Sequence, residues 1–133
     1  MKLSFSNIAW DFNQNDEICE ILKNNNFSGI EIAPTIISPD PFTKSTDLVQ
    51  NFSNSLFKNY GFVIPSMQSI WFGRTENIFN SNDRETMIDY TKKIIDLANL
   101  INCPNLVFGC PKNRNMPGPN LEDQVIPFFK TIG

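Results

Sequence analysis

Four short apolar segments alternate with four amphipathic segments along this chain of 133 residues, and no other feature constrains its fold as strongly. The apolar segments are bounded by glycine, proline or asparagine, as β-strands are, whereas the other segments repeat apolar residues every three or four positions, as helices do. Strands that alternate with helices in this way predict a parallel sheet with right-handed crossovers. The strands are predicted at residues 2–10, 27–34, 62–70 and around 106–108.

Four helices are predicted, one after each strand. Asn15 is a suitable N-cap for the first helix, and Gly61 is a suitable C′ residue for the second. Pro127 fits the fourth helix only in its first turn, where a missing backbone N–H costs little. The stretch from Thr35 to Ser45 is predicted to be a loop because it contains several prolines. The helices are expected at residues 15–23, 48–60, 82–101 and 120–129.

Length and composition predict one globular domain. A chain of 133 residues that is 41% hydrophobic and 19% charged is long enough for a single core and too apolar for a disordered segment. Four strand–helix units can form a small open α/β sheet or one half of an eight-stranded barrel. The periodicity alone does not decide between these two folds.

Charge and hydropathy argue against two classes of partner. The 11 Lys and Arg residues are scattered among 14 Asp and Glu residues, and this balance, a net charge of −3, does not favour the phosphate backbone of nucleic acid. No apolar run approaches the length of a membrane span, and the first ten residues lack the apolar core of a signal peptide. Neither a nucleic-acid partner nor a membrane is therefore expected.

Cysteine and histidine usage limits the chemistry that the chain can carry. Cys19, Cys103 and Cys110 are odd in number and form no CxxC pair, which favours reduced thiols in a cytoplasmic protein over disulfides or a zinc site. Histidine is absent. No histidine-dependent triad or histidine metal ligand can therefore be built from this chain.

Four segments resemble the sugar phosphate isomerase/epimerase family, whose members have the xylose isomerase-like TIM-barrel fold. They are SNIAW at 6–10, FSGIEIAP at 27–34, VIPSMQSIWFG at 63–73 and NLVFGCPKNR at 105–114. The resemblance spans essentially the whole chain and implies a parallel (βα)4 half of a TIM barrel, truncated, with residues 1–133 forming the N-terminal half of the domain. A complete barrel needs eight such units, typically roughly 250 residues.

The resemblance implies that the complete parent enzyme binds a divalent metal of the Mn, Mg, Co or Zn type. In the family, carboxylates at the ends of strands five to eight hold that ion, often with His or Gln, and acid/base glutamates lie in the same half. The ion polarises a carbonyl and its neighbouring hydroxyl while a carboxylate moves a proton through an enediolate. This chain alone is therefore expected to hold no metal and no catalytic residue, and to have negligible turnover.

Candidate substrate-binding residues follow from position, because active sites of TIM barrels collect at the carboxyl ends of the strands. An amide can donate to and accept from sugar hydroxyls, indole faces can pack against a sugar ring, and cations can bind a phosphate. The candidates are Trp10 after the first strand, Glu31 in the second, Gln68 and Trp71 after the third, and Lys112 and Arg114 after the fourth.

Each candidate also has a purely structural interpretation. Glu31 and Gln68 can form hydrogen bonds to neighbouring strands, and Arg114 can satisfy Glu31 across the mouth of the barrel. The tryptophans can simply pack a loop against the rim. Lys112 and Arg114 can form ion pairs with Glu31, with Glu76, or with the half of the barrel that this chain lacks.

The expected function is that of the N-terminal part of a metal-dependent sugar or sugar phosphate isomerase/epimerase, which contributes a substrate-binding wall. Its partners are then a small sugar or sugar phosphate and either the missing C-terminal half barrel or a second copy of the chain. One alternative is a non-enzymatic (βα)4 module that binds a ligand or associates with itself. A second is an endonuclease IV-like DNA repair fragment, which the acidic balance and the lack of histidine oppose.

Overall fold

Four strand segments run parallel to one another in the same order as they occur along the chain. The structure, a computed structural model, describes residues 2–118 and 122–133. Strands β1 (Ser4–Ser6) and β2 (Gly29–Glu31) pair in parallel, with Ser6 opposite Glu31. The third and fourth segments join this pair through single parallel bridges. These bridges link Gly29 to Val63, Ile32 to Met67 and Met67 to Leu106.

The parallel arrangement confirms the predicted α/β topology, although the strands are shorter than predicted. The last two segments form isolated bridges rather than continuous strands. Pro65 is one cause, since proline has no N–H to donate to a neighbouring strand. The chain passes from a strand segment through a helix to the next parallel segment three times, and α5 follows the fourth segment, as in one half of a (βα)8 barrel.

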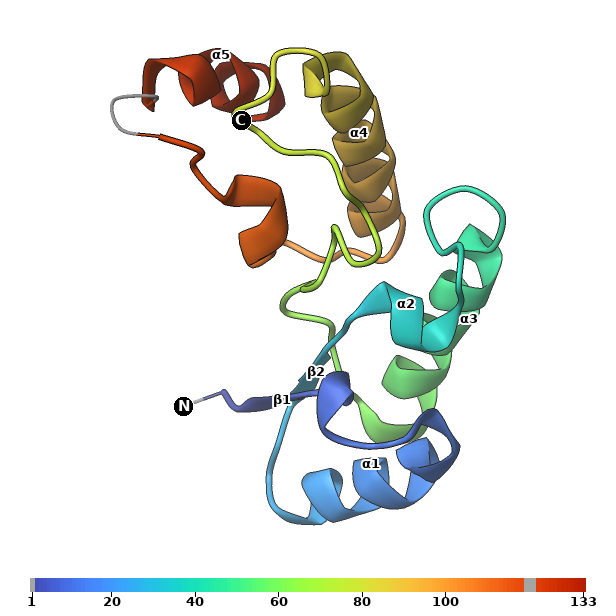
Figure 1. Ribbon diagram of the computed structural model, residues 1–133. Coiled ribbons are helices and arrows are strands. Elements are labelled where there is room, and N and C mark those ends of the chain that lie inside the picture. The colour runs from blue at the N-terminus through green and yellow to red at the C-terminus, as the bar shows by residue number, and fades with distance from the viewer. Residues whose placement is uncertain (1, 119–121) are drawn as a thin grey trace.

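The helices lie close to their predicted positions. Figure 1 shows α1, α3 and α4 following one another from the bottom to the top of the view. The loop predicted from Thr35 to Ser45 is interrupted by one short helix, α2, which begins at Pro34. The helices are α1 (Asn15–Asn24), α2 (Pro34–Ile37), α3 (Thr46–Tyr60), α4 (Arg84–Leu100) and α5 (Glu122–Ile132), with 3-10 turns η1 (Asn7–Ala9), η2 (Phe12–Gln14) and η3 (Pro111–Arg114).

Two residues were predicted to lie at helix ends. Asn15 is the first residue of α1 rather than its N-cap, which is Gln14, so that prediction was wrong. Gly61 follows α3 with a φ of 73°, the left-handed conformation expected of a C′ glycine. Pro127 lies inside α5 rather than in its first turn, so it occupies the position where a proline costs a helix more. The predicted start of this helix at Asn120 falls outside the residues that the structure describes.

The third strand segment contains an extra residue opposite β2. Between their two bridges, β2 advances three residues, from Gly29 to Ile32, while the third segment advances four, from Val63 to Met67. Such a β-bulge changes which side chains face each side of the sheet. Met67 therefore lies with Ile32 on one side, where both are completely buried. The residues on either side of Met67 face the opposite side of the sheet.

The hydrophobic core lies between the strand segments and the helices. It includes Ile30 of β2 and Ile32 just after β2, which are completely buried, together with buried residues of α1, α3 and α4. Burial of this much apolar surface is the main favourable term in folding. No helix in the described part of the chain is long and apolar enough to cross a membrane.

The buried thiol of Cys19 makes the stability of the folded chain depend on pH in the alkaline range. Cys19 is completely buried in α1, and burial raises the pKa of its thiol from 9.0 to about 11, with Asp16 and Glu20 adding to the shift. The pKa of this thiol is higher in the folded chain than in the unfolded chain. The free energy of unfolding is therefore at its full value below pH 9 and falls as the pH rises towards 11.

We expect the free energy of unfolding to fall by about 1 kcal/mol between pH 8 and pH 10 from this thiol alone. Urea titrations of the chain at the two pH values measure the change, and the Cys19→Ala variant should lose this part of it. An equal pH dependence in Cys19→Ala would contradict the assignment.

Candidate functional site

A polar cluster spans three neighbouring strand segments at their carboxyl ends. Glu31 of β2 accepts hydrogen bonds from Ser66 Oγ at 2.6 Å and from Gln68 Nε2 at 2.7 Å. Gln68 Nε2 also donates to Ser6 Oγ at 2.5 Å. All four residues are partly rather than fully buried, so the cluster is accessible from one side.

The cluster brings together two of the predicted site residues, Glu31 and Gln68. Both carboxylate oxygens of Glu31 have a neutral donor, and it forms no ion pair with Arg114 among the residues described. Ser6 faces the same side as Glu31 because the two are in register, and strand alternation could have indicated it. The sequence contains no comparable signal for Ser66, because Ser66 faces Glu31 only as a result of the bulge in the third strand segment.

A pocket of about 570 Å³ lies next to this cluster, between the loops that follow the third and fourth strand segments. Ser69, at its edge, directly follows Gln68 in the chain. The lining is mainly apolar, and it includes two of the predicted site residues, Trp71 and Lys112. The remaining lining residues are Ser69, Phe72, Gly73, Arg74, Thr75, Gly109, Cys110, Pro111 and Asn113.

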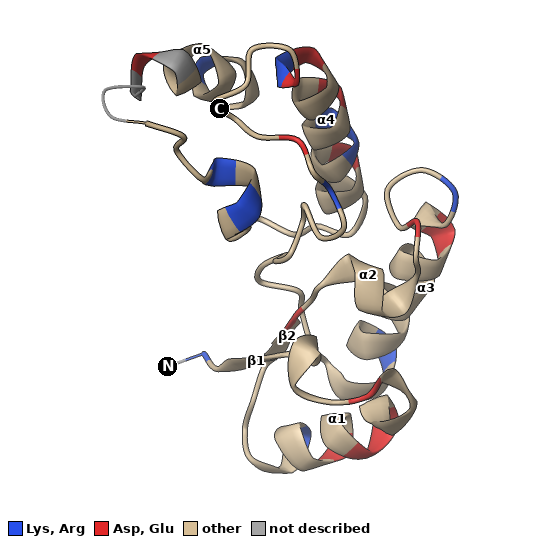
Figure 2. Cartoon of the chain, viewed as in Figure 1, with Lys and Arg blue, Asp and Glu red and all other residues tan. Residues whose placement is uncertain are grey.

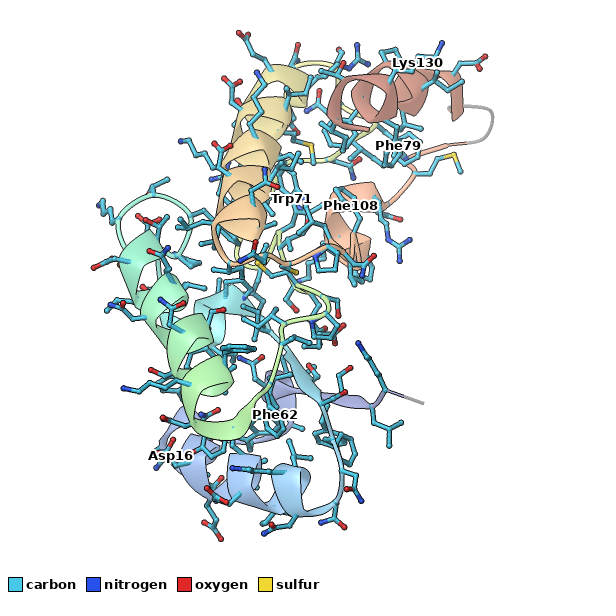
Figure 3. All side chains as sticks on the ribbon, turned by 180° about the vertical axis from the view of Figure 1, so that it is seen from behind. Asp16, Phe62, Trp71, Phe79, Phe108 and Lys130 are labelled. Atoms are coloured by element: carbon cyan, nitrogen blue, oxygen red, sulfur yellow. The ribbon has the colours of Figure 1, made fainter. Side chains whose placement is uncertain are left out.

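Trp71 is a buried residue of the pocket lining. It is 1% exposed, and its ring contacts those of Tyr90 and Phe108, with centroids 5.2 and 5.8 Å away. Figure 3 shows Trp71 beside Phe108. The indole Nε1 is buried without a hydrogen-bond partner. The ring therefore lines the pocket with very little of its surface exposed.

Asn113 holds the two loops of the pocket together. It is buried, and its Nδ2 donates to the backbone oxygens of Arg74 at 3.2 Å and Glu76 at 2.8 Å. The backbone carbonyl oxygen of Asn113 also accepts a hydrogen bond from the Ile78 amide at 2.9 Å. The sequence shows Asn113 only as one polar residue between two cations, so nothing in it reveals this role.

Arg74 is occupied by local interactions. It forms an ion pair with Glu76, and its guanidinium lies 4.4 Å from the centroid of the Tyr90 ring. Burial raises the pKa of the Tyr90 hydroxyl, an effect that the Arg74 charge partly opposes. Because Glu76 pairs with Arg74, it does not pair with Lys112 or Arg114 in the part of the chain that the structure describes.

The two predicted cations lie on η3, which directly follows the fourth strand segment. Lys112 and Arg114 are both exposed, and Figure 2 shows their basic segments on this single turn. Neither forms an ion pair within the described ranges. Lys112 lines the pocket, whereas Arg114 is not among its lining residues.

Trp10 is separate from the pocket. It is half-buried beside β1, where its ring stacks on Phe5 with a centroid distance of 6.1 Å and an interplanar angle of 12°. The nearby Asn7 is buried and accepts a hydrogen bond from the Ala33 amide at 2.7 Å. This contact ties η1 to the end of β2 and fixes the loop after the first strand.

The described residues do not by themselves fit a divalent metal. No group of three or more His, Cys, Asp or Glu side chains gathers anywhere in residues 2–118 and 122–133. Glu31 is the one carboxylate of the polar cluster, and each of its oxygens already accepts a hydrogen bond. Divalent ions in proteins need several converging ligands.

Comparison with known proteins gives two similar solved structures. No family model matches the chain, and no curated protein matches it in sequence. The probable 3-DHS dehydratase AsbF of Bacillus anthracis, involved in petrobactin synthesis, superposes with a TM-score of 0.56 and 21% identity over 80% of this chain. The 3-keto-D-glucoside 4-epimerase YcjR of E. coli superposes with a TM-score of 0.62 and 14% identity over 99% of this chain.

These similarities define the class of fold. Both structures are xylose isomerase-like TIM barrels, and this chain has the fold of part of such a barrel. It spans 37% of the AsbF chain and 50% of the YcjR chain. The parallel order of the strand segments agrees with one part of such a barrel.

Proposed function

We propose that this chain is the N-terminal half of a xylose isomerase-like barrel that isomerises or epimerises a sugar or sugar phosphate, and that it provides the substrate-binding wall. The observation that carries the proposal is the cluster of Glu31, Gln68 and Ser66 at the carboxyl ends of the strands, with the 570 Å³ pocket beside it. Active sites of barrels of this type lie at that end.

The polar cluster suits the hydroxyl groups of a sugar. Glu31 can accept from a hydroxyl, while the amide of Gln68 and the hydroxyl of Ser66 can each donate or accept. Because the three side chains already hold one another at 2.6 to 2.7 Å, little side-chain entropy remains to be lost on binding. A hydroxyl that replaces one of these internal contacts therefore meets oriented partners.

The pocket suits a larger part of the substrate that ends in an anionic group. Phe72 and Pro111, which are both exposed, offer apolar surface to the carbon skeleton. Lys112 is the unpaired cation of the lining within the described residues, and Arg114 follows it on the same turn. A phosphate bound to Lys112 and Arg114 would gain charge-assisted hydrogen bonds. Trp10 is assigned to the outer rim of the same wall.

The residues that move the proton are assigned to the other half of the barrel. In the complete enzyme a divalent ion of the Mn, Mg, Co or Zn type would polarise the substrate carbonyl. Glu31, Gln68 and Lys112 of this half would bind and orient the substrate against it. The two matched barrels, each about twice as long as this chain, support the division.

The reactivity of the Cys110 thiol should report whether the pocket is occupied, and this provides a test of the proposed function. It lines the pocket and is partly exposed, whereas Cys19 and Cys103 are buried and burial raises the pKa of both thiols. The thiolate is the reactive form, so in the folded chain at pH 8 Ellman's reagent should modify Cys110 first.

We expect glucose 6-phosphate or fructose 6-phosphate to slow this reaction about tenfold at ten times the dissociation constant, because only the free protein reacts. The unphosphorylated sugars should protect more weakly. Lys112→Gln should abolish the advantage of the phosphorylated sugars, while Lys44→Gln, an exposed lysine outside the pocket, should not. Absence of protection by any sugar, together with protection by inorganic phosphate alone, would refute a sugar site.

A further inference from the structure

Asn113 links the η3 turn to the loop after the third strand segment by three hydrogen bonds. Its Nδ2 donates to the carbonyl oxygens of Arg74 and Glu76, and its own carbonyl oxygen accepts from the Ile78 amide. Asn113 is 2% exposed, so water does not replace a partner that is lost. Removal of this side chain would therefore leave two carbonyl oxygens of the neighbouring loop without their donor.

A second amide, that of Asn77, holds η3 from the opposite side of the contact. Asn77 Nδ2 donates to the carbonyl oxygens of Asn115 at 2.9 Å and of Lys112 at 3.4 Å. Every hydrogen bond that links residues 110–115 to the remainder of the described chain has Asn77 or Asn113 as one partner. The position of the turn therefore depends on these two side chains.

The segment that receives these bonds, residues 74–78, has fixed contacts of its own. The Asn77 amide donates to Asp83 Oδ2 at 2.9 Å, and Asn77 Oδ1 accepts from the Phe79 amide at 2.9 Å. Ile78 is 5% exposed and belongs to the hydrophobic core. The η3 turn is thus anchored to a segment that is itself held in place by α4 and the core.

The two exposed cations lie on either side of the buried anchor. Lys112 precedes Asn113 and Arg114 follows it, and successive side chains of a 3-10 turn point about 120° apart. We propose that Asn113 is a positioning residue for anion binding, because its amide fixes the turn that presents Lys112 to the anionic group of the substrate. The inference rests on the proposed function, since it concerns the anionic end of that same pocket.

A fixed turn favours anion binding because it lowers the entropy that binding costs. Lysine is a point charge on a flexible stem, and a ligand that also had to order the backbone beneath it would bind more weakly. Here Asn77 and Asn113 hold the backbone on both sides of the Lys112 side chain. The sugar hydroxyls are assigned to Glu31 and Gln68, which belong to the strand segments and not to η3. Loss of the anchor should therefore weaken binding of the anion and spare binding of the sugar.

Protection of Cys110 can give the dissociation constants of fructose 6-phosphate, fructose and inorganic phosphate, with each rate divided by that of the same variant without ligand. In Asn113→Ala we expect both phosphate-containing ligands to bind about tenfold more weakly, and fructose to stay within about twofold of the wild type. Asn77→Ala, at a half-buried position, should weaken the same two ligands about threefold. Asn115→Ala is the matched control, because Asn115 is exposed and its side chain forms no hydrogen bond within the described chain. Circular dichroism measures whether each variant is folded.

The three ligands separate the failure of this inference from the failure of the proposed function. Equal weakening of fructose and fructose 6-phosphate in Asn113→Ala would show a purely structural role and overturn the inference, while the sugar site would stand. Protection by inorganic phosphate alone would refute the sugar site, yet a selective loss of that protection in Asn113→Ala would still support the positioning role.

Three further results would overturn the inference. They are unchanged binding of both phosphate-containing ligands in Asn113→Ala, an equal loss in Asn115→Ala, and no protection of the wild-type chain by any of the three ligands. If Asn113→Ala does not fold, the comparison of Asn77→Ala with Asn115→Ala decides: equal affinities for inorganic phosphate in these two variants would contradict the role of the amides.

Discussion

Replacing Trp71 with alanine is expected to lower the free energy of unfolding by about 4 kcal/mol, the range found when large aromatic side chains are removed from a core. Trp71 is 1% exposed and is the largest of the fully buried side chains among the described residues. Its ring joins Tyr90 on α4 to Phe108 in the fourth strand segment. Removing it leaves a cavity where the second half of the chain packs on the strand wall.

Two variants make this prediction specific. Phe72→Ala changes the next residue in the same loop, but Phe72 is 71% exposed, so its loss should change the stability by less than about 0.5 kcal/mol. Trp71→Phe should cost much less than Trp71→Ala, because it keeps most of the ring volume and removes the buried indole N–H that has no partner. Urea denaturation of the three variants measures the differences. Equal effects at positions 71 and 72 would show that Trp71 is not a core residue.

Gly29→Ala is expected to lower the free energy of unfolding by about 2 to 3 kcal/mol, the cost of overpacking a rigid site. A Cβ at position 29 would lie 2.7 Å from the carbonyl oxygen of Val63 and 3.1 Å from Cδ of Pro65. The obstructing groups are backbone and a proline ring, which cannot rotate away. Gly to Ala substitutions at unstrained sites stabilise by about 0.4 to 1 kcal/mol through the unfolded chain, a gain too small to offset this contact.

Gly109 provides the matched control for Gly29. A Cβ at position 109 would meet only Cγ1 of Val107 at 3.5 Å, an ordinary van der Waals contact, and its backbone is not in the left-handed region. Gly109→Ala should therefore leave stability within about 0.5 kcal/mol of the wild type or raise it slightly. Thermal and urea unfolding of the two variants test the pair. If Gly29→Ala is as stable as Gly109→Ala, the close approach of β2 to the third segment is not present in solution.

The topology could be predicted from the sequence because its signals are local. α1, α3 and α4 begin and end within a few residues of the predicted helices, since apolar spacing and terminal residues act within a single element. The lengths of the third and fourth strands could not be predicted. Pairing depends on neighbours that are distant in sequence, and one extra residue opposite β2 reduces the third strand to isolated bridges.

The candidate site could be predicted in part. Glu31 and Gln68 were selected because they lie at strand ends, and the structure joins them directly. Trp71 was expected to present a flat face to the substrate, but packing from α4 and the fourth segment buries it. Whether Lys112 and Arg114 bind a substrate anion stays a prediction, which the Cys110 protection experiment addresses.

The sequence by itself determined the order of strands and helices, the parallel topology and the segments from which the site residues come. These properties follow from periodicity and turn residues, which act over a few positions. The tertiary structure decided which of those residues meet, because side-chain partners depend on register. The bulge in the third segment turns Ser66 and Gln68 towards Glu31, and the buried Asn113 joins the two loops around the pocket. Contacts of this kind appear only when distant segments are packed together.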